Sequence, residues 1–336
     1  MAVGTKQPIK HSMCRKNKLY LEEEKDMDIR NILLVSPMYK ELQVLIEKEA
    51  PGKSFRFIPE EKLTQAELSW ADALVSFNLK ADYDYSSVKW VHSLGAGVDR
   101  FLFKKEWNDE ILLTRTICSF GQRIAEYCLS YILKDLQFHD TFQEQQQQKK
   151  WEQRTPKLLG EQKILVYGTG EIGQMIAKVF SGLGVDVYGV SLSGKEKEYY
   201  TEVLKLDSYF SRLNEMNYVI NTLPLTEKTE KLFDSSIFSR LSDAGFINVG
   251  RGASVDEEAL LQALTDKLVS FAVLDVFAQE PLPENNPFWS HPRVQMTPHI
   301  SAVTTANEGA ACFLETLKNI DENKPLTNRV DTIKGY

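Results

Sequence analysis

The feature that most constrains the fold is a regular alternation of short apolar runs with segments of helical periodicity. Strands are predicted at residues 31–36, 54–58, 72–77, 89–93 and 111–115, and again at 163–167, 185–190, 218–222, 246–249, 270–275 and near 294–296. Helical patterns such as Lys40–Ala50 lie between the runs. This alternation is typical of parallel sheets whose faces are covered by helices. The 336 residues therefore predict an α/β protein of two doubly wound parallel-sheet domains, each large enough for its own core.

Charge and cysteine content narrow the class of protein. The chain has 40 Lys and Arg against 47 Asp and Glu, a net charge of −7 that disfavours a broad nucleic-acid surface. No apolar run approaches the roughly 20 residues that a membrane helix needs. The four cysteines are dispersed and show no paired spacing, as expected of thiols in the reducing cytoplasm. A soluble cytoplasmic enzyme without a metal site, nucleic-acid partner or membrane contact is predicted.

Three segments stand apart from this alternation. Residues 1–26 carry scattered charges and no apolar core of a secretory signal, so we expect a disordered extension. The glutamine-rich stretch 143–150 follows an apolar-periodic helix, and we expect that helix to continue into a solvated arm around Trp151. A last helix at 307–319 has no strand after it and is expected to return to the first domain.

A glycine-rich loop opens the second block. Gly168, Thr169, Gly170, Glu171, Ile172 and Gly173 follow a strand and precede an amphipathic helix, with Gly184 where that helix is expected to end. The first glycine of such a loop permits a tight turn, the second lets the backbone approach a pyrophosphate, and the third allows close packing of helix and strand. Amide groups and the positive helix end then hold the phosphates. The loop predicts a dinucleotide site.

The end of the second strand of this block bears on which dinucleotide binds. An NAD site carries an acidic residue there, which accepts hydrogen bonds from the ribose hydroxyls. Asp186 lies too early, inside the strand, and Ser191, Ser193 and Lys195 follow the strand without a carboxylate. These residues tolerate a 2′-phosphate and favour NADP, although the missing acid leaves NAD open.

The first block carries a possible anion site. Gly95, Ala96 and Gly97 follow the strand that ends near His92. Two glycines around one small residue form a backbone concavity whose N–H groups can bind a carboxylate, although an ordinary strand-end turn has the same pattern.

Three chemically active side chains follow strands of the second block. Arg251 comes after the strand at 246–249, Glu280 after 270–275 and His299 after 294–296. Open α/β sheets bind ligands at the carboxyl ends of their strands, so the three residues are predicted to meet beside the dinucleotide. Ser254 and Glu257 have the spacing of a capping box, which predicts a helix directly after the arginine loop.

Together these motifs resemble the D-isomer-specific 2-hydroxyacid dehydrogenases, and most of all their glyoxylate/hydroxypyruvate reductase branch. The resemblance rests on residues 94–99, on Gly121-Gln-Arg-Ile-Ala-Glu126, and on Pro287–Pro292 ahead of Thr297-Pro-His299. It runs from about Met27 to the end of the chain, with the motifs in the family's order. Leu192 departs from the pattern, because many NADP-using members carry an arginine there.

The resemblance implies a role for each motif. Arg251 would bind the 2-oxo acid, His299 would be the acid/base, Glu280 would pair with it, and the backbone of Gly95–Gly97 would hold the substrate carboxylate. The cofactor would also contact Leu223, Pro224, Thr226 and Asp275, the last through its nicotinamide carboxamide. A homodimer is implied, with an arm at 140–158 crossing to the partner. The expected domains are a flavodoxin-like substrate domain (27–127 and 297–336) and a Rossmann NAD(P)-binding domain (128–296), with the active-site cleft between them.

The charges of these residues suggest a reaction. A guanidinium fork suits the carboxylate and carbonyl oxygens of a 2-oxo acid. As hydride reaches the keto carbon, a protonated His299 can donate to the carbonyl oxygen. The prediction is NAD(P)H-dependent reduction of glyoxylate, hydroxypyruvate or a similar acid to the D-2-hydroxy acid. A phosphoglycerate or D-lactate dehydrogenase stays open, as does a dinucleotide-sensing protein of the corepressor type, since fold alone does not establish catalysis.

Overall fold

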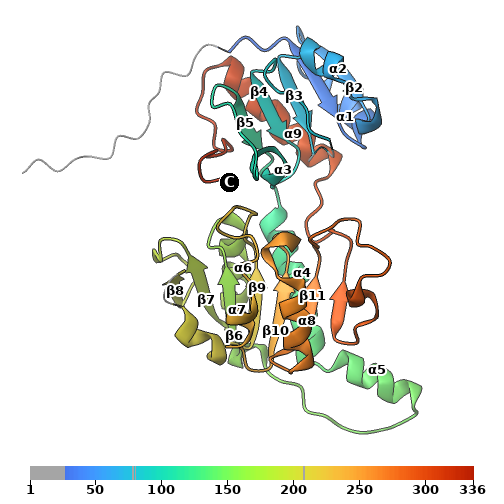
Figure 1. The fold of residues 1–336 in the computed structure, drawn as a ribbon, viewed down its shortest axis with the longest axis vertical. Helices are drawn as coiled ribbons and strands as arrows, with labels where there is room; N and C mark the ends of the chain where they lie inside the picture. Colours follow the sequence, from blue (N-terminus) through green and yellow to red (C-terminus); the bar gives the residue numbers. More distant parts are fainter. Residues whose placement is uncertain (1–26, 78, 80, 207–208) are drawn as a thin grey trace, which may run out of the picture.

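The described chain folds into two domains stacked end to end (Figure 1). A computed structural model describes residues 27–77, 79, 81–206 and 209–336, so the extension expected at 1–26 lies outside the described residues. The chain passes between the domains twice: just before helix α4 (Phe120–Leu136), and through residues 297–305 ahead of helix α9 (Ala306–Asp321). No helix within the described ranges is long and apolar enough to cross a membrane.

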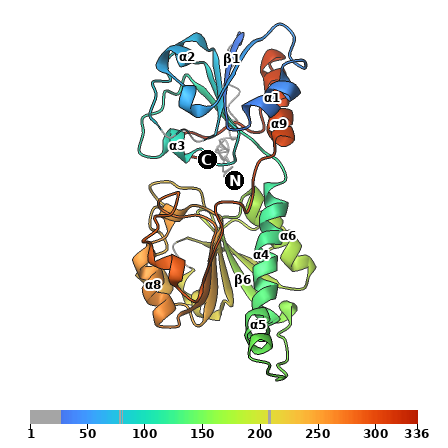
Figure 2. The ribbon, with the colours of Figure 1, turned by 90° about the vertical axis from the view of Figure 1, so that its right-hand side faces the viewer.

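The small domain is a five-stranded parallel sheet. Its strands run in the order β2 (Ser54–Ile58), β1 (Asn31–Val35), β3 (Ala73–Ser76), β4 (Trp90–Ser93) and β5 (Leu112–Arg115). Helices α1 (Tyr39–Ile46) and α9 cover one face, and α2 (Gln65–Trp70) and α3 (Asp99–Leu102) lie on the other (Figure 2). This order is that of the flavodoxin-like fold, as expected from the sequence.

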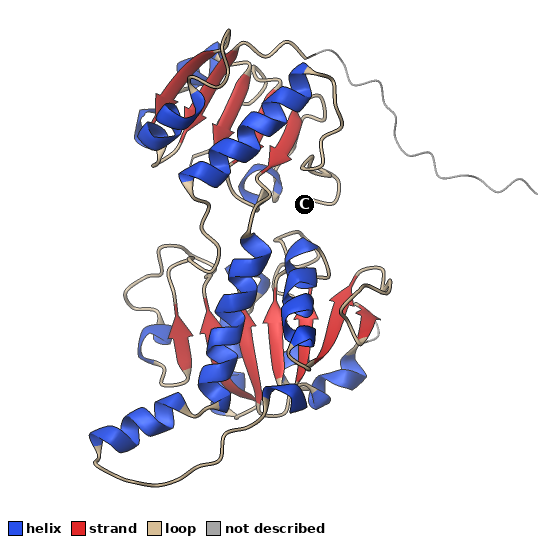
Figure 3. Cartoon of the chain, turned by 180° about the vertical axis from the view of Figure 1, so that it is seen from behind, coloured by secondary structure: helices blue, strands red, loops and turns tan. Residues whose placement is uncertain are grey.

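The large domain holds a seven-stranded parallel sheet. Its strands run in the order β12 (Val294–Met296), β11 (Val269–Leu274), β10 (Ala244–Asn248), β9 (Tyr218–Asn221), β6 (Lys163–Tyr167), β7 (Asp186–Ser191) and β8 (Glu202–Lys205). Helices α4 and α6 (Glu171–Gly182) pack side by side on one face (Figure 3), and α7 (Ser235–Phe238) and α8 (Glu257–Thr265) pack on the other. The chain changes direction between β6 and β9, the point at which sheets of this Rossmann type bind ligands.

Short 3₁₀ turns fill several connections. They lie at Glu60–Lys62, Leu159–Glu161, Phe210–Glu215, Gly252–Ser254 and Pro287–Ser290.

Helix α9 completes the small domain from the far end of the chain, as predicted. The ring of Phe313 stacks on the buried ring of Trp90 with centroids 5.5 Å apart, and the His92 ring packs edge-on against both. Helix α4 belongs to the other core, because Ile124 and Ala125 pack beneath the large sheet. The domain boundary expected between residues 127 and 128 therefore falls inside α4.

One helix ends earlier than expected, and one strand was missed. Helix α1 ends at Ile46 instead of Ala50, and residues 47–49 form a turn. Pro51 excludes only Ala50 from helical geometry. Strand β8 was missed because Leu204 is its one buried residue and charged side chains stand at both of its ends, so the alternation that marks a half-buried strand is absent.

The helix before the glutamine run does not continue, contrary to expectation. Helix α4 stops at Leu136, the last residue with a buried face, and Phe138 adopts a left-handed φ of 56°. A separate helix α5 (His139–Gln147) follows, with no buried residue, and leads into an exposed segment that includes Trp151. The guanidinium of Arg154 lies 3.8 Å over the Phe138 ring and ties this segment, which we call the arm (residues 148–158), to the helix break.

Candidate active site

The glycine-rich loop has the geometry that a dinucleotide requires. Gly168 has a φ of 97°, and a Cβ added at Gly173 would lie 1.8 Å from the Gly168 carbonyl oxygen. A Cβ at Gly170 would meet no atom within 4 Å, so the space in front of the first turn of α6 is open. The first and third glycines thus pack the turn, and the second leaves the room that a pyrophosphate needs beside the helix N-terminus.

The residues after β7 form a polar turn. The Gly194 amide donates to Ser191 Oγ (3.1 Å), and the Lys195 amide donates to Ser193 Oγ (3.3 Å). Lys195 and Leu192 are exposed beside them, while Asp186 lies at the opposite, amino end of β7. The turn presents hydroxyls and an ammonium group rather than a carboxylate.

The segment 223–226 follows β9 and is anchored by a buried asparagine. The Leu223 amide donates to Asn221 Oδ1 (3.0 Å), and Asn221 Nδ2 donates to Asn248 Oδ1 (2.9 Å) at the end of the neighbouring strand β10. The Thr226 amide donates to Thr229 Oγ1. Leu223, Pro224 and Thr226 therefore lie on the same sheet edge as the glycine loop, and their contact with the cofactor stays a prediction.

The backbone of Arg251 is fixed by Ser254, whose expected role was wrong. Ser254 Oγ donates to the Arg251 carbonyl oxygen (2.6 Å) and accepts from Asn221 Nδ2 (2.7 Å), so the hydroxyl cannot cap α8. Asp256 caps that helix instead, accepting from the Ala259 amide. The polar network of Asn221, Asn248 and Ser254 holds the arginine loop in place.

The Arg251 side chain reaches from the large domain to the small one. Its Nε donates to Asp99 Oδ1 (2.8 Å) and its Nη1 to the Gly250 carbonyl oxygen (2.8 Å). Its Nη2 lies so close to Gly97 that a Cβ there would be 1.4 Å away. The predicted substrate loop and the predicted substrate arginine thus face each other across the domain interface.

Two amides of the substrate loop are left for a ligand. Ser93 Oγ accepts from the Gly95 amide (3.3 Å) and lies within hydrogen-bond distance of the Gly95 and Gly97 carbonyl oxygens. Within residues 27–77, 79, 81–206 and 209–336, the amides of Ala96 and Gly97 have no acceptor. A loop with two free N–H groups beside a guanidinium suits a carboxylate.

His299 and Glu280 form a hydrogen-bonded pair. The distance from His299 Nδ1 to Glu280 Oε2 is 2.8 Å, and Glu280 Oε1 accepts from the Phe277 amide (3.0 Å). Burial raises the pKa of Glu280, but the hydrogen bonds from His299 and Phe277 and the charges of His299 and Arg251 outweigh it and lower the pKa overall. The carboxylate is therefore ionised at neutral pH, with Arg251 acting on it through charge.

Asp275 organises the loop that carries His299. Its buried carboxylate accepts from Thr297 Oγ1 (2.6 Å) and from the amides of Ile300 (2.7 Å) and Ser301 (2.9 Å). Between these donors His299 adopts a φ of 56°, an uncommon conformation for a histidine. The nicotinamide contact expected of Asp275 stays a prediction.

Several functional positions had only a weak signal in the sequence. Asp99 closes the motif that begins at Leu94, yet nothing in the pattern links it to an arginine 152 positions away. Asn221, Asn248 and Ser254 are polar residues at or just after the ends of apolar strands, which is the pattern that could have identified them.

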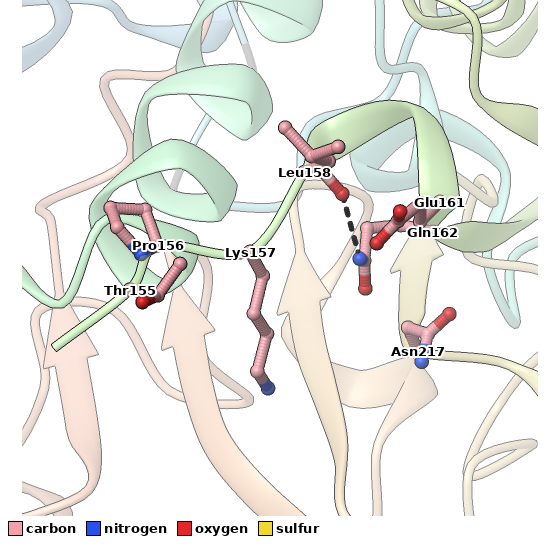
Figure 4. A pocket seen from close by; sticks show the side chains of 7 residues that line it. All are labelled: Thr155, Pro156, Lys157, Leu158, Glu161, Gln162 and Asn217. Carbon is pink, nitrogen blue, oxygen red and sulfur yellow. Dashed lines mark hydrogen bonds between the residues drawn. The ribbon is translucent and has the colours of Figure 1, made fainter.

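A hollow of about 610 Å³ lies elsewhere, under the arm (Figure 4). Its walls include Thr155, Lys157 and Asn217, and Leu158, whose carbonyl oxygen accepts from Gln162 Nε2 (2.8 Å). Gln162 and Asn217 precede β6 and β9, so the hollow opens at the amino ends of the strands, away from the site described above.

Known proteins share this sequence and architecture. Residues 129–301 match the family model for the D-isomer specific 2-hydroxyacid dehydrogenase NAD binding domain. Glyoxylate/hydroxypyruvate reductase A of Citrobacter koseri is 32% identical over 257 residues, which cover 74% of this chain and 82% of the relative. The corresponding reductase of Salmonella newport is 33% identical over the same coverage.

Solved structures extend the similarity to both domains. A D-isomer specific 2-hydroxyacid dehydrogenase of Xanthobacter autotrophicus, in complex with NADPH and MES, has a TM-score of 0.82 and 27% identity over 92% of this chain and 100% of its own. The NADPH-dependent glyoxylate/hydroxypyruvate reductase of Sinorhizobium meliloti, in complex with NADP and sulfate, has a TM-score of 0.80 and 25% identity over 91% and 100%. The chain therefore belongs to the D-isomer specific 2-hydroxyacid dehydrogenases and is an NAD(P)-dependent oxidoreductase.

Proposed function

We propose that this enzyme reduces a small 2-oxo acid, such as glyoxylate or hydroxypyruvate, to the D-2-hydroxy acid with NADPH as the reductant. The observation that carries the proposal is the pair of His299 and Glu280, 2.8 Å apart, at the same sheet edge as Arg251. The names of the Citrobacter and Salmonella relatives support the substrate class.

Recognition of the acid falls to Arg251 and the substrate loop. The guanidinium offers a planar fork of donors, which matches a carboxylate and the adjacent keto oxygen. The free amides of Ala96 and Gly97 complete the carboxylate site. Asp99, which now accepts from Arg251 Nε, fixes the direction in which the other N–H groups point.

Proton transfer falls to His299. NADPH, held at the glycine loop, would supply the hydride for the keto carbon, so that negative charge would develop on the keto oxygen. The protonated imidazole donates its proton to that oxygen, so C=O becomes CH–OH. Glu280 holds the imidazole in place through Nδ1 and stabilises its charged form, which leaves Nε2 to face the substrate.

We assign substrate binding to the small domain, residues 27–127 and 297–336, and dinucleotide binding to residues 128–296. Because Ile124 and Ala125 pack in the large core, the physical boundary is better placed at the start of α4.

We also propose a cytoplasmic location. The three cysteines in the described part of the chain, Cys118, Cys128 and Cys312, are free thiols, as is usual in a reducing compartment.

Replacing His299 with alanine tests the mechanism. We expect kcat with glyoxylate to fall roughly 10²–10⁴-fold, the range for loss of a general acid, with the Kd for NADPH unchanged. His139→Ala, an exposed histidine at the start of α5, is the matched control and should behave as wild type. Undiminished turnover in His299→Ala would contradict the assigned role.

A substrate panel separates the alternatives. Pyruvate and a phosphorylated hydroxypyruvate, assayed beside glyoxylate, would reveal a D-lactate or phosphoglycerate dehydrogenase by a higher kcat/KM. Tight NADPH binding without turnover of any 2-oxo acid would indicate a dinucleotide sensor instead.

The preference for NADPH is tested at the turn after β7. We expect Ser191→Asp to shift the ratio of kcat/KM values toward NADH, because a carboxylate repels the 2′-phosphate and accepts from ribose hydroxyls. Ser239→Asp, at an exposed serine after α7, adds the same charge elsewhere as a control. An equal response of both cofactors in Ser191→Asp would refute this reading of the turn.

A homodimer is the proposed assembly, with residues 140–158, which include the arm, crossing to the second copy. The proposal is supported by the family resemblance and by the exposure of the arm, in which the Trp151 side chain is 95% exposed. Leu158 of the same segment is a second exposed apolar side chain that a second copy would cover.

A further inference from the structure

Arg115, the last residue of β5, is a second cation beside the substrate loop. Its Nη1 donates to the Ala96 carbonyl oxygen (3.2 Å). Its main-chain amide donates to the Asn328 carbonyl oxygen, and its carbonyl oxygen accepts from Asn328 Nδ2. The residue is half-buried, and burial lowers the pKa of its guanidinium, so the charge is held at a desolvation cost. Neither the sequence motifs nor the proposed mechanism uses it.

This guanidinium lacks a counter-ion in the described part of the chain. No carboxylate there lies within ion-pair distance of Arg115, and of its five N–H groups one has an acceptor, the Ala96 carbonyl oxygen. The carboxylate whose charge does act on it is Glu171, the first residue of α6 in the dinucleotide loop. A partly buried cation with unused donors is expected to meet an anion. Glu171, whose charge acts on Arg115, belongs to the loop expected to hold the pyrophosphate.

The bond to Ala96 also sets the direction of an amide. In a trans peptide the C=O and the following N–H point in opposite directions. With the Ala96 carbonyl turned toward Arg115, the Gly97 N–H is turned away from Arg115. The Arg251 guanidinium lies against Gly97. Arg115 thus orients a donor of the substrate loop without touching the substrate.

We propose that Arg115 binds the pyrophosphate of the dinucleotide from the small domain and, through Ala96, positions the loop that receives the substrate carboxylate. The substrate half rests on the proposed function, whereas the cofactor half rests on the NAD(P) binding of the family. Cofactor binding completes the hydrogen bonds of Arg115, so the loop is best ordered after the dinucleotide has bound.

Cofactor titration is the first test. NADPH fluorescence, measured without substrate, should give a Kd for Arg115→Met raised about 10–100-fold, the range for losing charge-assisted hydrogen bonds. Arg115→Lys keeps the charge, so its Kd should rise by less than half as much as that of Arg115→Met when both rises are expressed as logarithms. Arg329→Met removes an exposed arginine from the segment paired with β5 and should leave the Kd unchanged. An unchanged Kd in Arg115→Met overturns the proposal, even where KM rises.

Steady-state kinetics test the substrate half. At saturating NADPH, Arg115→Met and Arg115→Lys should both raise KM for glyoxylate about tenfold or more with a much smaller change in kcat, since lysine lacks the fork that fixes the peptide. An unchanged KM in both variants overturns this half. His299→Ala shows the reverse pattern, a loss in kcat, so failure here is distinguishable from failure of the proposed function. Circular dichroism melting curves confirm that each variant is folded.

Discussion

At the scale of single residues, two glycines of one loop have different surroundings. A Cβ at Gly95 would meet its nearest atoms at 3.8 Å and 4.0 Å, which are ordinary contacts, whereas a Cβ at Gly97 would overlap Arg251. Neither glycine has a positive φ, so backbone strain does not separate them. The two glycines differ because the Arg251 guanidinium approaches Gly97 and not Gly95. Replacing each with alanine is therefore expected to affect substrate binding differently.

Gly97→Ala should raise KM for glyoxylate at least tenfold, because the new methyl group displaces the Arg251 guanidinium from the carboxylate site. Gly95→Ala is the matched control and should keep KM within about twofold of wild type. Steady-state kinetics at saturating NADPH measure both. Equal behaviour of the two variants would show that Arg251 does not depend on Gly97.

At the scale of elements, one carboxylate joins the two passages between the domains. Glu308, in the first turn of α9, accepts from Ser119 Oγ (2.6 Å) just before α4 and from Thr305 Oγ1 (2.7 Å) in the capping box of α9. It also pairs with Arg123 of α4 (3.1 Å). Burial raises the pKa of Glu308, but these hydrogen bonds and the charge of Arg123 prevail and lower it from the ordinary 4.5 to about 2.

This shift gives the stability of the protein a defined dependence on pH. Since the pKa is lower in the folded state, the carboxylate stabilises the fold fully above pH 4.5 and loses this effect as the pH falls toward 2. Glu308→Gln should therefore lower the free energy of unfolding by about 1–2 kcal/mol at pH 7. This figure is smaller than the full pKa shift would give, because Arg123 is partly exposed to water.

Urea unfolding at pH 7, 5 and 3.5 measures the free energy of unfolding of Glu308→Gln and of wild type. The difference between the two free energies should be smallest at pH 3.5. Glu315→Gln, at an exposed glutamate of the same helix, should change little at any pH. A difference that is constant across the three pH values would exclude the assigned role of the carboxylate.

At the scale of the whole molecule, the arm is an exposed segment that contacts the rest of the described chain through Arg154, over the Phe138 ring, and through the Lys157 amide, which donates to the Leu136 carbonyl oxygen. Residues 148–158 are exposed, and among them is the Trp151 ring. If a second copy covers the arm, charge introduced at its apolar centre should separate the copies.

Trp151→Glu is accordingly expected to reduce the sedimentation mass from twice 38.4 kDa to 38.4 kDa. Val44→Glu, at another exposed apolar side chain, serves as the control and should leave the mass unchanged. A wild-type protein that sediments as a single chain would refute the dimer.

The sequence predicted the site better than it predicted the arrangement of the domains. The positions of most strands along the chain, the glycine loop and the placing of Arg251, Glu280 and His299 after parallel strands follow from local patterns. The flavodoxin-like order of the small sheet was implied by the family resemblance. The contact of Arg251 with Asp99 does not, because it depends on how two separate sheets are set against each other by the passages at α4 and α9. The break at Phe138 and the edge strand β8 were missed for a related reason, since little apolar surface marks either of them.

The return of the last helix gives the protein an order of assembly. During synthesis the strands β6–β12 leave the ribosome before α9. The ring of Trp90 can stack only after Phe313, more than two hundred residues later in the chain, has been made. We expect the large domain to fold before the small one, because the face of the small sheet that α9 shares with α1 is completed only after residues 306–321 have been made. A chain that stops before α9 would thus have a folded large domain and a small sheet with part of one face open to chaperones and proteases.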